Sequence, residues 1–120
     1  MNDPAGERYA VIGVSENQEK YGYKVFRYLV DQGYTVFPVH LDAGTIDGHK
    51  RYAYLKDIPE TPTFVVTVVP PKVTEDIVRQ CHALGIKKVW MQPGSESDAA
   101  IQYSKGNGMQ VTANACIMLT

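Results

Sequence analysis

A glycine and a serine follow the first apolar run of this chain, in the stretch "VIGVSENQEKYGY". Gly13 permits a ligand to approach the backbone closely, and the hydroxyl of Ser15 suits an anion. Gly22 lies at the start of a helical pattern, where free N–H groups and the positive end of the helix dipole attract negative charge. These residue types predict a phosphate site in which Gly13, Val14 and Ser15 hold the anion.

The spacing of these glycines departs from both common phosphate-loop motifs. The dinucleotide motif G-x-G-x-x-G needs three glycines, each with its own steric role, and a P-loop ends in G-K-[ST]. This chain has neither pattern. From the residues alone, a strand-to-helix turn without any ligand therefore stays open as the alternative.

The other reactive side chains form no catalytic set in the sequence. Cys81 and His82 are neighbours on a predicted helix, where adjacent side chains diverge by roughly 100°. His49 lies among basic residues in a patch that we expect to be solvated, whereas His40 ends a predicted strand and can bond a phosphate or ribose. Cys116 is most simply a small buried side chain. The sequence shows no carboxylate pair and no metal-ligand spacing, so it indicates binding rather than catalysis.

Five short apolar runs predict the strands that must position these residues. The first and third runs are nearly continuous in valine and isoleucine, which is typical of strands buried on both faces of a parallel sheet. We predict an α/β fold with a single doubly wound, mostly parallel five-stranded sheet. The predicted strands are Tyr9–Val14, Tyr34–Val39, Thr63–Val69, Ile86–Gln92 and Met109–Ala113.

Helical patterns separate several of these strands. We expect Gly33 and Gly85 to end the first two helices, and Ser95 or Ser97 to cap the third. Residues 42–62 are irregular and are expected to hold a turn, a short strand and one helical turn. The predicted buried helix faces comprise Val25, Phe26, Leu29 and Val30; Val73, Ile77, Val78, Cys81 and Leu84; and Ala99, Ala100 and Tyr103.

Length and composition set the outer limits. The 120 residues fit one domain over residues 1–120, and 12 basic against 13 acidic residues indicate no nucleic acid or anionic membrane as partner. The first ten residues lack the features of a secretory signal, and the apolar runs are too short to span a bilayer. Two cysteines without zinc spacing favour reduced thiols and a cytoplasmic location.

Longer stretches carry a family resemblance. They are the "KYGY" helix start, the strand "GYTVFPV", the segment "VVPPKVTEDIVRQCHALGIKKVWMQPGSES" and the late "NACIM". On these residues, about 8 to 118, the chain resembles the small bacterial and archaeal CoA-binding domain proteins. The same Rossmann-like domain forms the CoA-binding end of succinyl-CoA synthetase α chains.

The resemblance implies that the ligand is coenzyme A or an acyl-CoA. Because the chain lacks the second domain of those synthetases, it implies a binding protein that is not catalytic on its own. Lys20 would add charge, Pro70 and Pro71 an apolar wall, and Cys116 a thiol able to exchange with that of CoA. The predicted cofactor-binding residues are Gly13, Val14, Ser15, Lys20, Tyr21, Gly22, Tyr23, Pro38, Val39, His40, Pro70, Pro71, Gln92, Gly94 and Cys116.

The end of the second strand departs from the family pattern. That pattern is P-V-N-P, often followed by a basic residue, whereas this chain has "PVHLD" with His40 and Asp42. A carboxylate after this strand is typical of proteins that bind the ribose of NAD. An NAD(P)- or other nucleotide-binding redox or regulatory domain therefore stays open, as does an interaction protein with a vestigial pocket. Eight tyrosines make a homodimer a further expectation.

Overall fold

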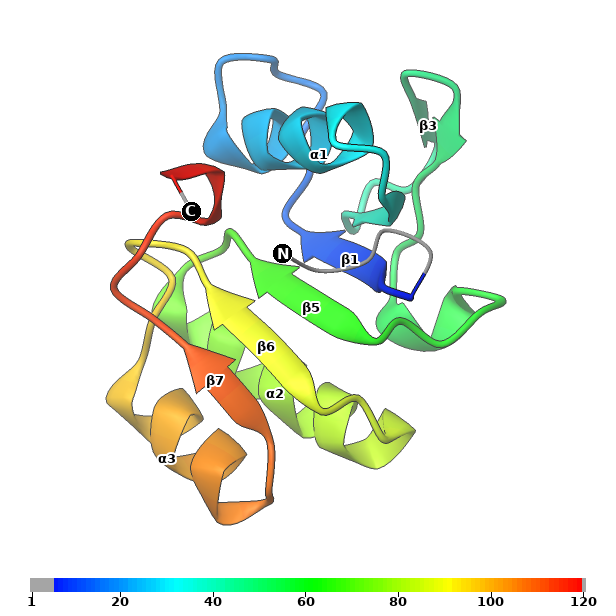
Figure 1. The fold of residues 1–120 in the computed structure, drawn as a ribbon. Coiled ribbons are helices and arrows are strands. Elements are labelled where there is room, and N and C mark those ends of the chain that lie inside the picture. The colour runs from blue at the N-terminus through cyan, green and yellow to red at the C-terminus, as the bar shows by residue number, and fades with distance from the viewer. Residues whose placement is uncertain (1–5, 120) are drawn as a thin grey trace.

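A five-stranded parallel sheet forms the centre of the protein in the computed structural model, which describes residues 6–119 (Figure 1). Its neighbouring strands all run parallel, in the order β2-β1-β5-β6-β7. The predicted α/β class is thereby confirmed, and each predicted strand is present to within two residues at either end. The strands are β1 (Arg8–Ile12), β2 (Thr35–Val39), β5 (Phe64–Thr67), β6 (Lys88–Met91) and β7 (Gln110–Thr112).

This strand order contains one switch point, between β1 and β5. From β1 the chain proceeds to β2 on one side, and then returns across the sheet to build β5, β6 and β7 on the other side. The loops that leave β1 and β5 therefore part in opposite directions. In doubly wound sheets such a point opens a crevice beyond the carboxyl ends of the strands, and ligands bind there.

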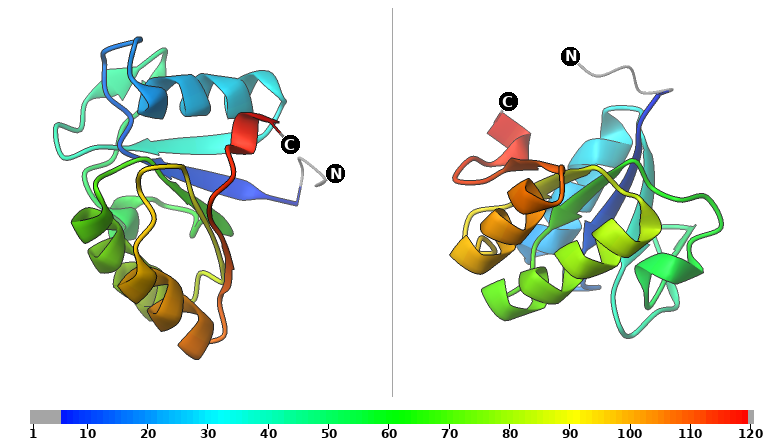
Figure 2. Two further views of the ribbon diagram at one scale, coloured as in Figure 1. Left: turned by 90° about the vertical axis from the view of Figure 1, so that its left-hand side faces the viewer. Right: turned by 90° about the horizontal axis from the view of Figure 1, so that it is seen from below.

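Helices cover both faces of the sheet. Helix α1 (Tyr21–Asp31) packs on one face, and α2 (Pro71–Leu84) and α3 (Asp98–Gly106) pack on the other (Figure 2). Successive side chains of β1 point to opposite faces: Tyr9 and Val11 belong to the core beneath α1, Ala10 and Ile12 to the core beneath α2. A short 3-10 helix, η2 (Ile117–Leu119), lies on the α1 side near the end of the chain.

Most residues of the predicted helix faces are buried, but some residues at the margins of these faces are exposed. Val73 and Leu84 are 42% and 36% exposed, because they lie in the first and last turns of α2, at the two ends of the helix. Ala99 is exposed while its neighbour Ala100 is buried, since one residue turns a helix by about 100°. Val30 is only half-buried. The remaining predicted face residues are buried or pack against the two cores.

The irregular segment contains the predicted turn and helical turn, but two short strands where the sequence predicts one. It holds a two-stranded antiparallel hairpin, β3 (Thr45–Ile46) and β4 (His49–Lys50), followed by one 3-10 turn, η1 (Leu55–Asp57). Gly85 ends α2 with φ 77°, and Gly33 lies just beyond the end of α1 with φ 91°. Among residues 6–119 there is no helix both long and apolar enough to cross a bilayer.

Candidate functional site

A cavity of about 710 Å³ opens at the switch point of the sheet. Its floor is the carboxyl end of the sheet, where the chain leaves β1, β2 and β5. The start of α1 borders one side, and α2 together with η1 borders the other. The lining residues are Ile12, Gly13, Ser15, Lys20, Tyr21, Gly22, Val39, His40, Leu41, Ala53, Tyr54, Leu55, Val68, Val69, Pro70, Val73, Asp76, Ile77 and Gln80.

The structure brings about half of the predicted site residues into this cavity. Those that line it are Gly13, Ser15, Lys20, Tyr21, Gly22, Val39, His40 and Pro70. Those that lie outside its lining are Val14, Tyr23, Pro38, Pro71, Gln92, Gly94 and Cys116. Four of the residues outside the lining lie near residues that line it, on or after β1, β2 and β5, whereas Gln92 and Gly94 follow β6 and Cys116 lies near the end of the chain.

Two glycines allow close backbone contacts at the loop that follows β1. Gly13 has φ 104°, and a Cβ added to it would overlap the carbonyl oxygen of Val68. A Cβ added to Gly22 would overlap the carbonyl oxygen of Gly13. Gly13 therefore permits a close contact between the loops that follow β1 and β5, and Gly22 permits one between the first of these loops and α1. Each glycine has a steric role, although the spacing is not that of the dinucleotide motif.

The N-terminus of α1 is left without a cap. Lys20 occupies the N-cap position, no side chain accepts a hydrogen bond there, and the first turn contains no acidic residue. Within residues 6–119 the N–H groups of Tyr21, Gly22 and Tyr23 have no acceptor. Free N–H groups and the positive end of the dipole thus lie beside the cavity, next to the ammonium group of Lys20.

The loop between Gly13 and α1 supports itself with local hydrogen bonds. The N–H of Asn17 donates to Oγ of Ser15 over 3.0 Å, and the N–H of Glu19 donates to Oδ1 of Asn17 over 2.9 Å. These contacts resemble the side-chain turns that serine and asparagine often form. Oγ of Ser15 acts only as an acceptor here, so its own proton is available to a ligand.

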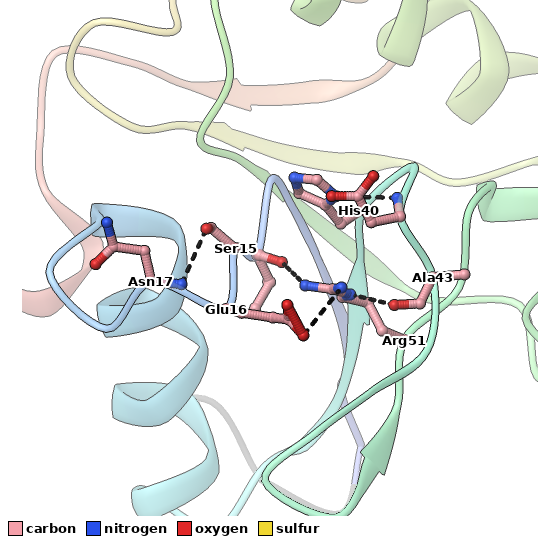
Figure 3. A network of polar contacts seen from close by, with 8 residues as sticks. Ser15, Glu16, Asn17, His40, Ala43 and Arg51 are labelled. Atoms are coloured by element: carbon pink, nitrogen blue, oxygen red, sulfur yellow. Dashed lines mark hydrogen bonds and ion pairs between the residues drawn. The ribbon is translucent and has the colours of Figure 1, made fainter.

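His40, at the end of β2, contacts Asp42 through its ring. Its Nδ1 accepts a hydrogen bond from the N–H of Asp42 over 3.1 Å (Figure 3). Oδ2 of Asp42 lies 3.5 Å from the same nitrogen. In the neutral ring whose Nδ1 accepts this hydrogen bond, Nε2 carries the proton and is a donor. His40 lines the cavity, whereas Asp42 does not and its side chain is 78% exposed.

The residues predicted after β6 serve a different purpose. Gln92 is buried, its Nε2 donates to Sγ of Cys116 over 3.3 Å, and its Oε1 accepts from the N–H of Ile117 over 2.7 Å. Nε1 of Trp90 donates to the carbonyl oxygen of Ala115 over 2.8 Å. These bonds fasten the end of the chain across β6. Gln92 and Cys116, both predicted to contact the cofactor, contact each other, and neither lines the cavity.

The other predicted residues outside the lining have plain structural positions. Val14 and Pro38 are buried, and Pro71 is the exposed first residue of α2. The hydroxyl of Tyr23 donates to Oδ2 of Asp47 over 2.7 Å, and this hydrogen bond raises the pKa of Tyr23. Gly94 has φ 95° and open space where a side chain would lie.

Four exposed apolar side chains surround the mouth of the cavity, and the sequence prediction includes just one of them. Tyr21 is the predicted residue, and Leu41, Tyr54 and Val73 are the three that it omits. Exposed apolar patches of this kind often mark binding sites. The register of α2 contains a signal for Val73, but no local pattern in the irregular segment distinguishes Tyr54.

The histidines and Cys81 provide no catalytic centre. Burial raises the pKa of Cys81 to about 12, so its thiol stays protonated. His49 is not simply solvated, as the sequence suggests; it is half-buried, and its ring meets the edge of Phe26 at 5.1 Å. His82 meets Tyr103 in the same manner. In the part of the chain that the structure describes, no group of three or more His, Cys, Asp or Glu residues could hold a metal ion.

Comparison with protein families matches residues 7–120 to the CoA binding domain. The chain belongs to this family. The resemblance noted in the sequence is thereby confirmed.

Three relatives illustrate the similarity. The α subunit of ADP-forming acetate–CoA ligase II from Pyrococcus furiosus is 37% identical over 81 residues, which are 67% of this chain and 18% of that subunit. An uncharacterized protein of Bacillus subtilis is 28% identical over 116 residues, 92% of this chain and 82% of its own length. The solved structure of a conserved hypothetical protein from Pyrococcus furiosus has a TM-score of 0.89 at 33% identity, covering 94% of this chain and 97% of the other. The chain thus spans less than a fifth of the ligase subunit.

Proposed function

We propose that this chain is a coenzyme A or acyl-CoA binding protein and that the cavity at the switch point is its site. The observation that carries the proposal is the uncapped N-terminus of α1 beside the loop of Gly13 and Ser15. Three free helix N–H groups, the hydroxyl of Ser15 and the ammonium of Lys20 together suit a diphosphate. Membership of the CoA binding domain family supports the same ligand.

The rest of the cavity suits the other parts of CoA. Tyr21, Leu41, Tyr54 and Val73 offer apolar surface to an adenine ring and to a pantetheine arm. The N–H at Nε2 of His40 can donate to a ribose or phosphate oxygen. Cys116 lies outside the lining, so a mixed disulfide with CoA would need the end of the chain to move away from Gln92.

The proposal is for binding rather than catalysis. The ligase relative is more than five times longer than the matched region, and the described cavity holds no nucleophile paired with a base. We propose that residues 1–120 form one CoA-binding domain and that any ligation occurs elsewhere. A cytoplasmic location and a homodimer stay predictions.

Asp42 favours a nicotinamide or another nucleotide as the competing ligand. Its carboxylate follows β2, where dinucleotide-binding proteins contact a ribose. Its side chain is 78% exposed and does not line the cavity. Asp42 is therefore weaker support for NAD than the diphosphate site is for CoA.

The experiment is a calorimetric titration of the protein with CoA, acetyl-CoA, NAD and ADP. A matched pair of variants locates the site: Ser15→Asp places a carboxylate in the phosphate loop, and Ser97→Asp makes the same change at the capped start of α3. We expect Ser15→Asp to weaken CoA binding by more than about tenfold and Ser97→Asp to leave it unchanged, because aspartate also caps helices well. Binding of NAD but not CoA, or equal effects of the two variants, would contradict the proposal.

A further inference from the structure

Arg51 is a buried cation directly behind the phosphate loop. Its side chain is 3% exposed, and it does not line the cavity. Nη1 donates to the carbonyl oxygen of Val14 over 2.9 Å, and Nε donates to the carbonyl oxygen of Ala43 over 2.6 Å (Figure 3). Arg51 therefore links the loop that follows β1 to the loop that follows β2, and these two loops border the cavity.

The charge of Arg51 is poorly compensated. Among the described residues its one carboxylate partner is Glu16, whose Oε1 lies 4.0 Å from Nη2 and whose side chain is 77% exposed. Its close partners are neutral carbonyl groups. A buried charge without a close counter-charge is costly, and the attraction of such a charge for an added anion is screened only weakly. The positive potential behind Ser15 is thus available to a ligand.

The bond from Arg51 also fixes the direction of a donor. The carbonyl of Val14 and the N–H of Ser15 belong to one peptide unit, and the peptide bonds of the described residues are all trans. In a trans peptide the C=O and N–H point in opposite directions. Because Arg51 holds the carbonyl, the N–H of Ser15 points away from Arg51, and it has no acceptor within residues 6–119. A hydrogen bond to the carbonyl further polarises the peptide and strengthens its N–H as a donor.

We propose that Arg51 is a positioning residue for the diphosphate of the ligand, an inference that rests on the proposed function. It touches no ligand atom. It holds the Val14–Ser15 peptide so that the N–H of Ser15 faces the anion, and it supplies the positive potential behind that peptide. Glu16 is the opposing element, because its carboxylate weakly neutralises Arg51 in the free protein and repels an anion bound beside Ser15.

Ala43 provides a second sign that Arg51 orders these loops. This alanine has φ 50°, a left-handed conformation that is uncommon for a residue with a side chain. Strained backbone of this kind persists where surrounding contacts hold it. Nε of Arg51 bonds the carbonyl of Ala43, and the N–H of Arg51 donates to the carbonyl of Gly44 over 2.8 Å.

The test uses calorimetric titration of the whole chain with CoA and, separately, with inorganic pyrophosphate. The variants are Arg51→Gln, Arg51→Lys and Glu16→Gln. Arg27→Gln is the matched control, since Arg27 of α1 pairs with Asp31 of the same helix and with Asp47 between β3 and β4, and does not line the cavity. We expect Arg51→Gln to lower the affinity for both ligands by about tenfold or more, and Arg51→Lys to retain most of the original affinity. Glu16→Gln should raise the affinity by about two- to threefold. Arg27→Gln should stay within about twofold of the unchanged protein.

A spectroscopic readout separates positioning from mere stability. The backbone amide resonance of Ser15 should shift on addition of CoA in the unchanged protein and in Arg51→Lys, and should shift much less in folded Arg51→Gln. If folded Arg51→Gln binds both ligands as tightly as Arg27→Gln, the inference is wrong. If Arg51→Gln does not fold, Glu16→Gln decides, because its exposed side chain can change without unfolding the protein: tighter binding supports the inference, and unchanged or weaker binding overturns it.

Failure of the proposed function would look different. If the unchanged protein binds pyrophosphate but not CoA, the choice of CoA is wrong and the role of Arg51 is judged on pyrophosphate alone. If it binds neither ligand, both the function and the inference are wrong.

Discussion

Helices α1 and α3 begin in opposite ways. At α3 the side chain of Ser97 accepts a hydrogen bond from the N–H of Ala100, and Asp98 lies in the first turn. At α1 a lysine occupies the N-cap, and the first turn has neither a side-chain cap nor an acid. The side chain of Ser97 thus caps the N-terminus of α3, whereas the N-terminus of α1 has no side-chain cap and borders the cavity.

The difference separates a structural helix end from one that is open to a ligand. Aspartate, asparagine and serine are the common N-caps because they bond the free N–H groups and offset the dipole. Lys20 does neither, and its charge adds to that of the dipole. This arrangement destabilises the free protein locally but leaves the donors ready for an anion.

The largest effect is expected from adding a side chain where α1 contacts the loop that follows β1. Gly22→Ala places a Cβ against the carbonyl oxygen of Gly13, and a backbone overlap of this kind cannot relax by side-chain rotation. We expect a loss of about 3 kcal/mol in the free energy of unfolding, together with loss of CoA binding. Urea denaturation and calorimetry measure the two effects.

Gly106→Ala is the matched control for this change at the end of α3. Gly106 is helical and an added Cβ there meets no atom within 4 Å. We expect it to stabilise the protein by about 0.5–1 kcal/mol and to leave CoA affinity unaltered. A Gly22→Ala protein as stable as the unchanged chain would contradict the close contact.

The next prediction gives α1 the kind of cap that α3 has. Lys20→Asp should satisfy a free N–H group and offset the dipole, raising the free energy of unfolding by about 1 kcal/mol. The same carboxylate would occupy the anion site, so CoA affinity should fall by about tenfold or more. A parallel loss of stability and affinity would instead show that Lys20 is structural.

Removing the cap of α3 should have the reverse signature. Ser97→Ala takes away the hydrogen bond to the N–H of Ala100 and also the one that Ser97 donates to Glu75 over 2.6 Å. We expect the free energy of unfolding to fall by about 1 kcal/mol while CoA affinity stays the same. A change in affinity comparable to that of Lys20→Asp would remove the distinction between the two helix ends.

The sequence predicts the α1 side of the site better than the other side, for a physical reason. Local periodicity and glycine positions identify β1, the loop and the start of α1, so Gly13, Ser15 and Gly22 can be found before the fold is known. The opposite wall depends on the packing of residues 42–62, which have no regular period. Arg51 is therefore invisible to pattern analysis, because its importance comes from two distant carbonyl groups.

The C-terminal segment shows the same limit from the other direction. The sequence resemblance places Gln92 and Cys116 at the ligand, and the structure does bring them together. Their contact, however, is satisfied within the protein, since Gln92 also accepts from Ile117. A motif can assign two residues to one ligand, but tertiary packing decides whether they face a cavity or each other.

The smallest effect on stability is expected at the amino end of the sheet, opposite the end at which the ligand site lies. Burial alone would raise the pKa of Glu7, but hydrogen bonds from Lys88 (2.8 Å) and Thr63 (2.7 Å) outweigh it, and the pKa is lowered from its ordinary value of 4.5. A carboxyl group with a lowered folded-state pKa stabilises the protein above its unfolded-state pKa. That stability is lost as the pH falls through the lowered value.

Glu7→Gln should therefore lower the free energy of unfolding by about 1 kcal/mol or less at neutral pH, since Lys88 is partly exposed. The difference from the unchanged chain should shrink as the pH falls below about 4.5, whereas Glu60→Gln, an exposed control, should show no such change. Urea denaturation measures this stability difference at pH values from about 3 to about 7, which span the range of carboxyl titration.

CoA affinity at neutral pH should be unaffected, because Glu7 lies at the amino end of the sheet and the ligand site at the carboxyl end. A fall in CoA affinity for Glu7→Gln would mean that the two ends of the sheet are coupled. The different effects of substitutions at α1 and α3 could then no longer be assigned to local capping alone.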